Sequence, residues 1–270
     1  MTPPRGFRVE EIGDRLYFLR EDFPKALPIP LPEAPGPGIE HLPGGRGGVL
    51  RVHAGETPIV IRAYRHGGLT GPLLGSIYMG SGRGLAEIDA LLRLEEKGVP
   101  APRPVVLEWR PLVAGAAWGP GRLRLGTVEI PGAVSLFDFL ARTRAEPAAR
   151  RRAALEAAGE TIRKMHDAGV EHADLHVGNL LVLPSGEVAV VDLDRARLHP
   201  GPVPPAGRLR NLLRLRRSAR KRASDMLLTP AGRYRLYRAA MPPGLVSDEE
   251  LLRALSADDR RTGLHALLWD

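Results

Sequence analysis

Cysteine is absent from this sequence of 270 residues. Its absence excludes disulfide bonds, thiolate metal sites and cysteine nucleophiles, and it is compatible with a cytosolic protein. Long hydrophobic runs are absent as well, since no stretch approaches the roughly 18 uninterrupted apolar residues of a membrane-spanning helix. Residues 1–10 contain proline and charged residues and do not resemble a secretory signal. Any membrane contact is therefore expected to be peripheral.

Lysine and aromatic residues are scarce. Lysine occurs four times, arginine supplies the other 35 basic residues, and the net charge is +8. Arginine favours planar partners such as phosphate and carboxylate, although drift in genome composition explains an arginine excess equally well. A basic protein can bind nucleic acid, an anionic membrane or a phosphorylated ligand. Because aromatic residues make up only 5% of the chain, a stacking surface for single-stranded nucleic acid is not expected.

The remaining composition is that of a folded protein, with 43% hydrophobic and 26% charged residues. The length is near the upper limit for one hydrophobic core, so two small lobes or domains are expected. Proline and glycine in residues 24–38 predict an extended loop. The periodicity then predicts strands at 49–52, 58–64, 104–109 and 122–130, helices at 83–97, 133–143 and 147–169, and a hairpin of 180–183 with 187–191.

The densest polar cluster follows the long helix. It reads His172-Ala-Asp174-Leu-His176-Val-Gly-Asn179, and Asp192-Leu-Asp194 comes at the end of the hairpin. Two carboxylates and an amide oxygen are ligands that suit Mg²⁺, which also binds substrate phosphates. A Gly-rich turn, Arg62 on the next strand and Glu87 in the helix precede this cluster. In this order the parts are those of a kinase fold.

Several strings narrow the resemblance. The relevant segments are Gly44–Gly47, Val60–Gly68, Glu87 with Leu91 and Leu92, Gly98–Pro104, Ile130–Ala133 and Asn211–Ser218. Over about residues 40–222 the sequence resembles the lipopolysaccharide core kinase family, and within it the kinases of 3-deoxy-D-manno-octulosonic acid (Kdo). The resemblance implies an α+β, protein-kinase-like bilobal fold. Its parts would be an extension (1–38), a lobe with an antiparallel sheet and one main helix (39–132), and a mostly helical lobe (133–270).

The same resemblance implies roles for individual residues. Asp174 would be the catalytic base, and Asn179 and Asp192 would hold Mg²⁺ on the phosphates of ATP. Arg62 would pair with Glu87 where protein kinases have lysine. The further nucleotide contacts would come from the turn that contains Gly45, Arg46 and Gly47.

The implied reaction is transfer of the γ-phosphate of ATP to a hydroxyl of Kdo-lipid A. It would take place at the cytoplasmic face of the inner membrane, with no obligate protein partner. The alternatives are a heptose kinase of the same family, a small-molecule or protein Ser/Thr kinase, and a non-catalytic pseudokinase that docks on anionic membrane. A protein kinase is disfavoured because a Pro-rich stretch follows Asp192 and no Ala-Pro-Glu motif is present.

Four points stay open. His172 is expected to be structural, and Asp194 to be either a metal contact or a cap. The alternative to a kinase loop is the zinc cluster of a metallohydrolase, in which one face of a strand would carry His172, Asp174 and His176. The segment 208–222 holds eight basic residues and no acid, which fits either a solvated helix face or an interfacial helix on anionic lipid.

Overall fold

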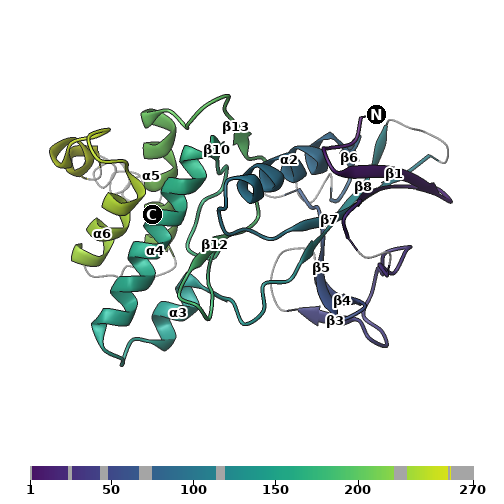
Figure 1. Cartoon of the computed structure of the whole chain (residues 1–270), viewed down its shortest axis with the longest axis horizontal. Coiled ribbons are helices and arrows are strands. Elements are labelled where there is room, and N and C mark those ends of the chain that lie inside the picture. The colour runs from purple at the N-terminus through teal and green to yellow at the C-terminus, as the bar shows by residue number, and fades with distance from the viewer. Residues whose placement is uncertain are drawn as a thin grey trace, which may run out of the picture. The chain divides into compact units, whose positions relative to one another are not determined.

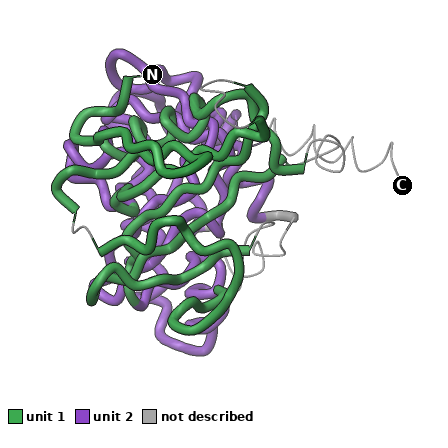
Figure 2. Tube along the Cα trace, turned by 90° about the vertical axis from the view of Figure 1, so that its right-hand side faces the viewer, with its two compact units in different colours: residues 1–92, 102–131 green, residues 93–101, 132–270 purple. Residues whose placement is uncertain are grey.

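The chain divides into two compact units in the computed structural model, which describes residues 2–23, 26–42, 48–66, 75–113, 119–221, 230–254 and 256. Unit 1 comprises residues 1–92 and 102–131, and unit 2 comprises residues 93–101 and 132–270 (Figure 2). The main helix of the N-terminal half, α2 (Gly82–Glu96), begins in unit 1 and ends in unit 2.

Unit 1 is built on an antiparallel sheet (Figure 1). The strands are β1 (Phe7–Ile12), β2 (Arg15–Arg20), β3 (Glu40–Leu42), β4 (Val49–Ala54), β5 (Thr57–Ala63), β6 (Tyr78–Met79), β7 (Pro104–Pro111) and β8 (Pro120–Val128). Their order is β1-β2-β7-β8-β5-β4-β3, and β6 pairs with β8 off this path. The four strands expected between residues 49 and 130 are therefore β4, β5, β7 and β8.

The N-terminal residues belong to this sheet. Where an extension is expected, β1 pairs with β2, and β2 pairs with β7 in a register that sets Leu16 opposite Trp109. The described part of the Pro-rich segment lacks helix, as expected, but it is not a free loop. Leu31 is 2% exposed and joins the core cluster of the sheet, against which Leu27 and Ile29 also pack. Side chains from residues 7–23 and 26–42 thus contribute to the hydrophobic core of unit 1.

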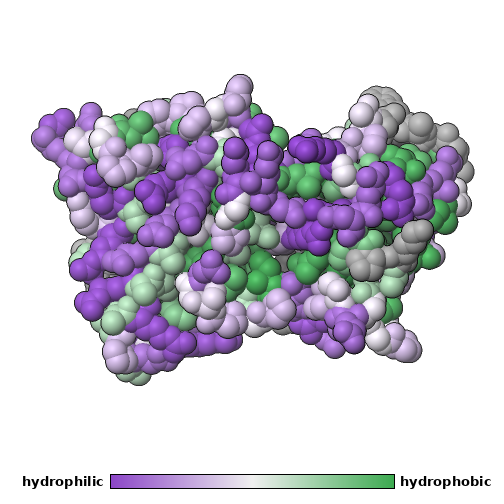
Figure 3. All heavy atoms as spheres, viewed as in Figure 1, coloured by the Kyte–Doolittle hydropathy of each residue, from purple (hydrophilic) through white to green (hydrophobic). Residues whose placement is uncertain are grey.

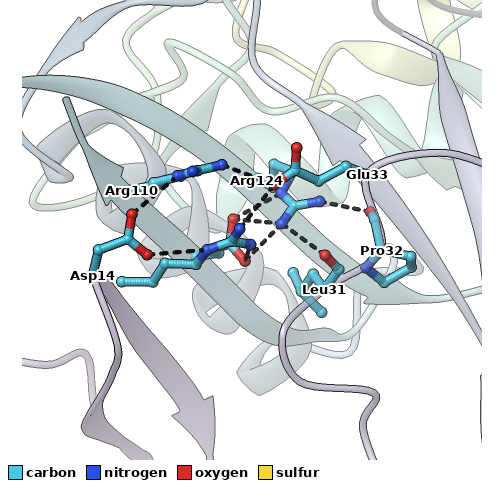
Figure 4. A network of polar contacts seen from close by, with 8 residues as sticks. Asp14, Leu31, Pro32, Glu33, Arg110 and Arg124 are labelled. Atoms are coloured by element: carbon cyan, nitrogen blue, oxygen red, sulfur yellow. Dashed lines mark hydrogen bonds and ion pairs between the residues drawn. The ribbon is translucent and has the colours of Figure 1, made fainter.

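A buried carboxylate on β7 fixes the Pro-rich segment to the sheet (Figure 4). The Glu108 side chain is 3% exposed and accepts hydrogen bonds from Arg124 at 2.6 to 2.8 Å and from Arg15 at 3.3 Å. Arg124 in turn donates to the carbonyl oxygens of Leu31 and Pro32 at 2.9 and 2.6 Å. The guanidinium of Arg124 therefore donates hydrogen bonds both to the buried carboxylate and to the backbone carbonyls of the Pro-rich segment.

Replacing Glu108 with alanine should lower the free energy of unfolding by about 3 kcal/mol, because it leaves the largely buried Arg124 without its carboxylate partner. Urea denaturation measures the loss. The matched control is Glu10→Ala, since Glu10 forms an exposed pair with Arg8, and such pairs are worth less than about 1 kcal/mol. An equal loss in the two variants would contradict a structural role for the network.

Helix α2 lies close to the sheet of unit 1. Its buried face includes Glu87, Leu91 and Leu94, together with Ile88 and Ala90. At Gly84 a Cβ atom would lie 2.5 Å from Cδ1 of Leu107 on β7, so a larger residue would have to displace this buried side chain. The close packing positions the next turn of the helix, which carries Glu87, against strand β5.

Unit 2 is mostly helical. Its elements are β9 (Val134–Ser135), α3 (Leu136–Arg142), α4 (Ala148–Asp167), β10 (Val170–Glu171), β11 (Leu180–Val182), β12 (Val188–Val190), β13 (Arg197–Leu198), α5 (Pro205–Lys221) and α6 (Pro230–Ala240). Two small sheets, β12-β11-β9 and β10-β13, lie beside the helices. The predicted hairpin is β11 with β12, in which Leu180 faces Val190.

The long helix α4 organises the core of unit 2. It buries Leu155, Ala158, Ile162 and Met165 on one face, as a helical period requires. At Gly159 a Cβ would lie 2.6 Å from Cβ of Ala239, so α4 and α6 pack closely. The face of these helices visible in Figure 3 is largely hydrophilic. Among the described residues, no helix has the length and apolar character needed to cross a membrane.

Candidate active site

In unit 1 the structure brings together the two residues expected to pair. Nη2 of Arg62 on β5 donates to both carboxylate oxygens of Glu87 on α2, each at 2.7 Å. The Glu87 side chain is 3% exposed and that of Arg62 is 27% exposed. The pair therefore has a buried acid at its base and a guanidinium that reaches the surface of the unit, as phosphate recognition by Arg62 would require.

A second donor to Glu87 comes from a residue that the sequence analysis missed. The hydroxyl of Tyr64, two residues after Arg62 on the same face of the chain, donates to Oε2 of Glu87 at 2.5 Å. The Arg62 guanidinium also lies 4.7 Å from the centroid of the Tyr64 ring. Tyr64 thus fixes the orientation of both members of the pair. The signal in the sequence is the i, i+2 spacing, which sets Arg62 and Tyr64 on one face of an extended segment.

The predicted Gly-rich turn falls in the sequence between β3 and β4. Gly45, Arg46 and Gly47 lie outside the described residues. The strands on either side of the turn, β3 and β4, pair antiparallel with Leu42 opposite Val49. The turn therefore connects neighbouring strands, and its contacts with phosphate stay a prediction.

In unit 2 a buried histidine holds the loop that carries Asp174. His172 is 1% exposed, and its Nδ1 accepts a hydrogen bond from the backbone N–H of Asp174 at 3.0 Å. Its Nε2 therefore carries the proton and donates to the carbonyl of Val191 at 3.1 Å. Burial lowers the pKa of His172, so the ring is neutral near pH 7. His172 links the loop to the end of β12, which favours the structural reading.

The zinc alternative is wrong. Residues 172–176 do not form a strand, since a turn lies at 173–174, and both ring nitrogens of His172 are engaged in hydrogen bonds. Nδ1 of His176 accepts a hydrogen bond from the N–H of Gly178, which closes the following turn. In the described part of the chain, no three His, Cys, Asp or Glu side chains are grouped so as to hold a metal ion.

Asp174 is the exposed carboxylate of this loop, and Asn179 is its buried neighbour. The Asp174 side chain is 70% exposed, whereas Asn179 is 7% exposed. Nδ2 of Asn179 donates to the backbone carbonyl of Asp174 at 3.1 Å. This bond fixes the amide group, so that Oδ1 remains as the oxygen available to a metal ion.

Asp192 lies at the same end of the hairpin as Asn179. The N–H of Val191 donates to the carbonyl of Asn179 at 3.0 Å, which places the next residue, Asp192, beside it. Asp192 has a φ of 60°, in the left-handed region that non-glycine residues rarely adopt. Such strain persists where the surroundings enforce it and is concentrated at functional sites. The donor set of amide and carboxylate oxygens fits Mg²⁺. Asp194 is half-buried, and its role stays open.

Helix α5 supplies contacts to this loop that the sequence analysis did not identify. Arg208, which is 2% exposed, donates to Asp167 at 2.6 Å, and Arg210 donates to Glu171 at 3.0 Å. Arg214 donates to Oδ1 of Asp174 at 3.1 Å and to the carbonyl of the preceding residue. Three of the basic side chains of segment 208–222 therefore contact the protein itself. The alternative of a fully solvated helix face is therefore wrong. Arg222, the last residue of the segment, lies outside the described residues.

Asn211 is the buried centre of these contacts. Its Oδ1 accepts from the N–H of His172 at 3.1 Å and its Nδ2 donates to the carbonyl of the same residue at 2.8 Å. Oδ1 also accepts from Nε2 of His166 at 2.9 Å, and burial lowers the pKa of His166 to about 4. The signal in the sequence is that Asn211 falls on the apolar stripe of Leu212 and Leu215, where a polar side chain requires partners.

The fold and the site together define a class of protein. An antiparallel sheet with an Arg–Glu pair precedes a helical unit with Asp-x₄-Asn and a strained Asp after a hairpin, and these are the parts of a kinase-like phosphotransferase. The sequence model of the Lipopolysaccharide kinase (Kdo/WaaP) family matches residues 40–239. The chain belongs to this family of lipopolysaccharide kinases.

Individual relatives agree with this assignment. The 3-deoxy-D-manno-octulosonic acid kinase of Vibrio cholerae is 32% identical over 181 residues, which cover 66% of this chain and 72% of that protein. The enzyme of the same name from Stenotrophomonas maltophilia is 34% identical over 180 residues, which cover 65% and 67%. The structure of WaaP in complex with acyl carrier protein superposes with a TM-score of 0.58 at 24% identity, over 86% of this chain and 88% of that one. This last similarity confirms the kinase-like fold.

Proposed function

We propose that the protein transfers the γ-phosphoryl group of ATP to a hydroxyl of Kdo in Kdo-lipid A. The observation that carries the proposal is the similarity to proteins named 3-deoxy-D-manno-octulosonic acid kinase over two thirds of the chain. The site supports it, because Asp174, Asn179 and Asp192 are all present and the loop that carries Asp174 and Asn179 is held by hydrogen bonds of the buried residues His172 and Asn179. These features disfavour a pseudokinase.

In this proposal Asp174 accepts the proton of the acceptor hydroxyl. The hydroxyl oxygen forms a bond to the γ-phosphorus as the bond to the β,γ-bridging oxygen breaks, and ADP leaves. Asn179 and Asp192 would hold Mg²⁺, which when bound neutralises charge on the phosphates. Arg62, held by Glu87 and Tyr64, would contribute its guanidinium to the same phosphates.

The proposed sugar acceptor also indicates where in the cell the protein acts. A lipid-linked sugar stays in its membrane, so the kinase must act at a membrane surface. We propose peripheral association with the cytoplasmic face of the inner membrane. The basic composition of α5 supports this, with Arg217 among its exposed residues.

Incubation of the purified protein with ATP, Mg²⁺ and Kdo-lipid A tests the proposal. Phosphate should appear on the Kdo sugar, as mass spectrometry and ³¹P NMR of the product would record. Lipid A without Kdo and denatured casein, a general protein-kinase substrate, serve as controls and should stay unmodified. Transfer to heptose on a Kdo-containing acceptor, transfer to casein, or no transfer to any acceptor would contradict the proposal.

A further inference from the structure

Among the described side chains of α5, Arg214 contacts the proposed base. Its Nη1 donates to Oδ1 of Asp174 at 3.1 Å and to the carbonyl of Ala173. Side-chain exposure is 47% for Arg214 and 70% for Asp174, so both groups face solvent in unit 2. A cation and a reactive carboxylate therefore share one accessible surface.

Both contacts of Arg214 are made by one nitrogen. Within the described residues, the Nε and Nη2 atoms of Arg214 take part in no hydrogen bond. The same holds there for Oδ2 of Asp174. A guanidinium can offer such an edge as two parallel N–H donors to a carboxylate or a phosphate. Oδ2 of Asp174 can meanwhile accept the proton of a hydroxyl. The pair thus presents an anion-binding edge next to the oxygen proposed to act as base.

The position of Arg214 is fixed from within the helix. One turn earlier, Asn211 forms two hydrogen bonds with the backbone of His172, which ties α5 to the loop. The neighbouring Arg208 and Arg210 contact Asp167 and Glu171, outside the proposed catalytic group. Arg214 differs from them because its carboxylate partner is the one proposed to react and is itself exposed.

We propose that Arg214 is an acceptor-binding residue that pairs with the carboxylate of the acid sugar through its Nε and Nη2 edge. The inference rests on the proposed function, since an octulosonic acid carries a carboxylate that a neutral sugar lacks. Pairing with this carboxylate orients the sugar so that its hydroxyl meets Oδ2 of Asp174. Recognition of the acid group then gives Arg214 a part in acceptor specificity.

The test compares Kdo-lipid A with its Kdo methyl ester, which removes the negative charge but keeps the hydroxyls. For the wild type, kcat/KM should be roughly 10- to 100-fold lower on the ester, the range expected when a charge-assisted hydrogen bond is lost. In Arg214→Gln the two acceptors should become equivalent, with a raised KM for the acid and an unchanged KM for ATP. Arg214→Lys should recover part of the preference.

Arg152→Gln is the matched control, because it removes an exposed arginine of α4 and should keep the wild-type preference for the acid. Equilibrium binding of the two acceptors to Arg214→Gln reports the same preference if turnover is too slow to measure. Equal losses on acid and ester would overturn the proposal and leave only a positioning role. The proposal would also be overturned if removing the lipid A phosphates abolished the effect of Arg214→Gln while esterifying the Kdo carboxylate did not. Wild-type protein inactive on Kdo-lipid A would refute the proposed function itself.

Discussion

Replacing Asp174 with asparagine should lower kcat by roughly 10²- to 10⁴-fold, the usual contribution of a general base, while the affinity for ATP changes little. Asparagine is nearly isosteric, so the backbone bond to His172 and the contact between Arg214 and Oδ1 can remain. What disappears is the carboxylate oxygen that would take the hydroxyl proton. Single-turnover kinetics measure the chemical step, and calorimetric titration with ATP measures binding.

Glu160→Gln is the matched control for this experiment. Glu160 is an exposed acid on α4 in the same unit, so its substitution removes one negative charge away from the loop. The control should keep kcat within about twofold of the wild type, as expected of a surface substitution. An Asp174→Asn variant with wild-type kcat, or one that lost only ATP affinity, would refute the role of base.

The secondary structure of the segments that carry the kinase motifs could be predicted well from the sequence. Helix 83–97 is observed at Gly82–Glu96, and the hairpin at 180–191 is observed as β11 and β12. In these segments the local hydrophobic period predicts the type of element, and a glycine or turn residue at each boundary predicts where it begins and ends. The polar spacing after the long helix likewise indicated kinase chemistry, because Asp-x₄-Asn and the later Asp lie within one short stretch of chain.

Long-range partners could not be predicted in the same way. β2 pairs with β7, which follows almost ninety residues later, and no local pattern specifies this register. Glu108 and Arg124 are adjacent across β7 and β8, yet their role becomes visible only once the Pro-rich segment lies over them. In each case the deciding interaction joins segments that are distant in sequence.

Helix α5 is the clearest example of this limit. Its composition, with eight basic residues between 208 and 222, indicated a solvated or membrane-facing helix. The structure gives Arg208, Arg210 and Arg214 partners around the loop, which contradicts a fully solvated face and leaves contact with a membrane a prediction. The helical period does set Arg208 and Asn211 on the stripe of buried leucines. A polar residue on such a stripe indicates a partner, but the partner itself lies on another element.

Asn211 therefore provides the sharpest test of how the loop is held. Replacing it with alanine should lower the free energy of unfolding by about 3–5 kcal/mol, because the N–H and carbonyl of His172 and the His166 ring lose their shared partner. The loop two residues before Asp174 would also lose its anchor. We expect kcat to fall by roughly tenfold or more while the KM for ATP changes less, since chemistry depends on placement within about 1 Å.

Two further variants keep the outcome interpretable. Asn211→Asp retains an oxygen that can accept from His172 and His166, so it should lose less stability than the alanine variant near neutral pH. Ser218→Ala, at a half-buried position of the same helix, should change stability by less than about 1 kcal/mol. Urea denaturation gives the stabilities and steady-state kinetics give the rates. If Asn211→Ala matched Ser218→Ala in both measurements, α5 would not hold the loop that carries Asp174. A stability loss with unchanged kcat would restrict Asn211 to a structural role, because the geometry of Asp174 would then not depend on the helix that contacts it.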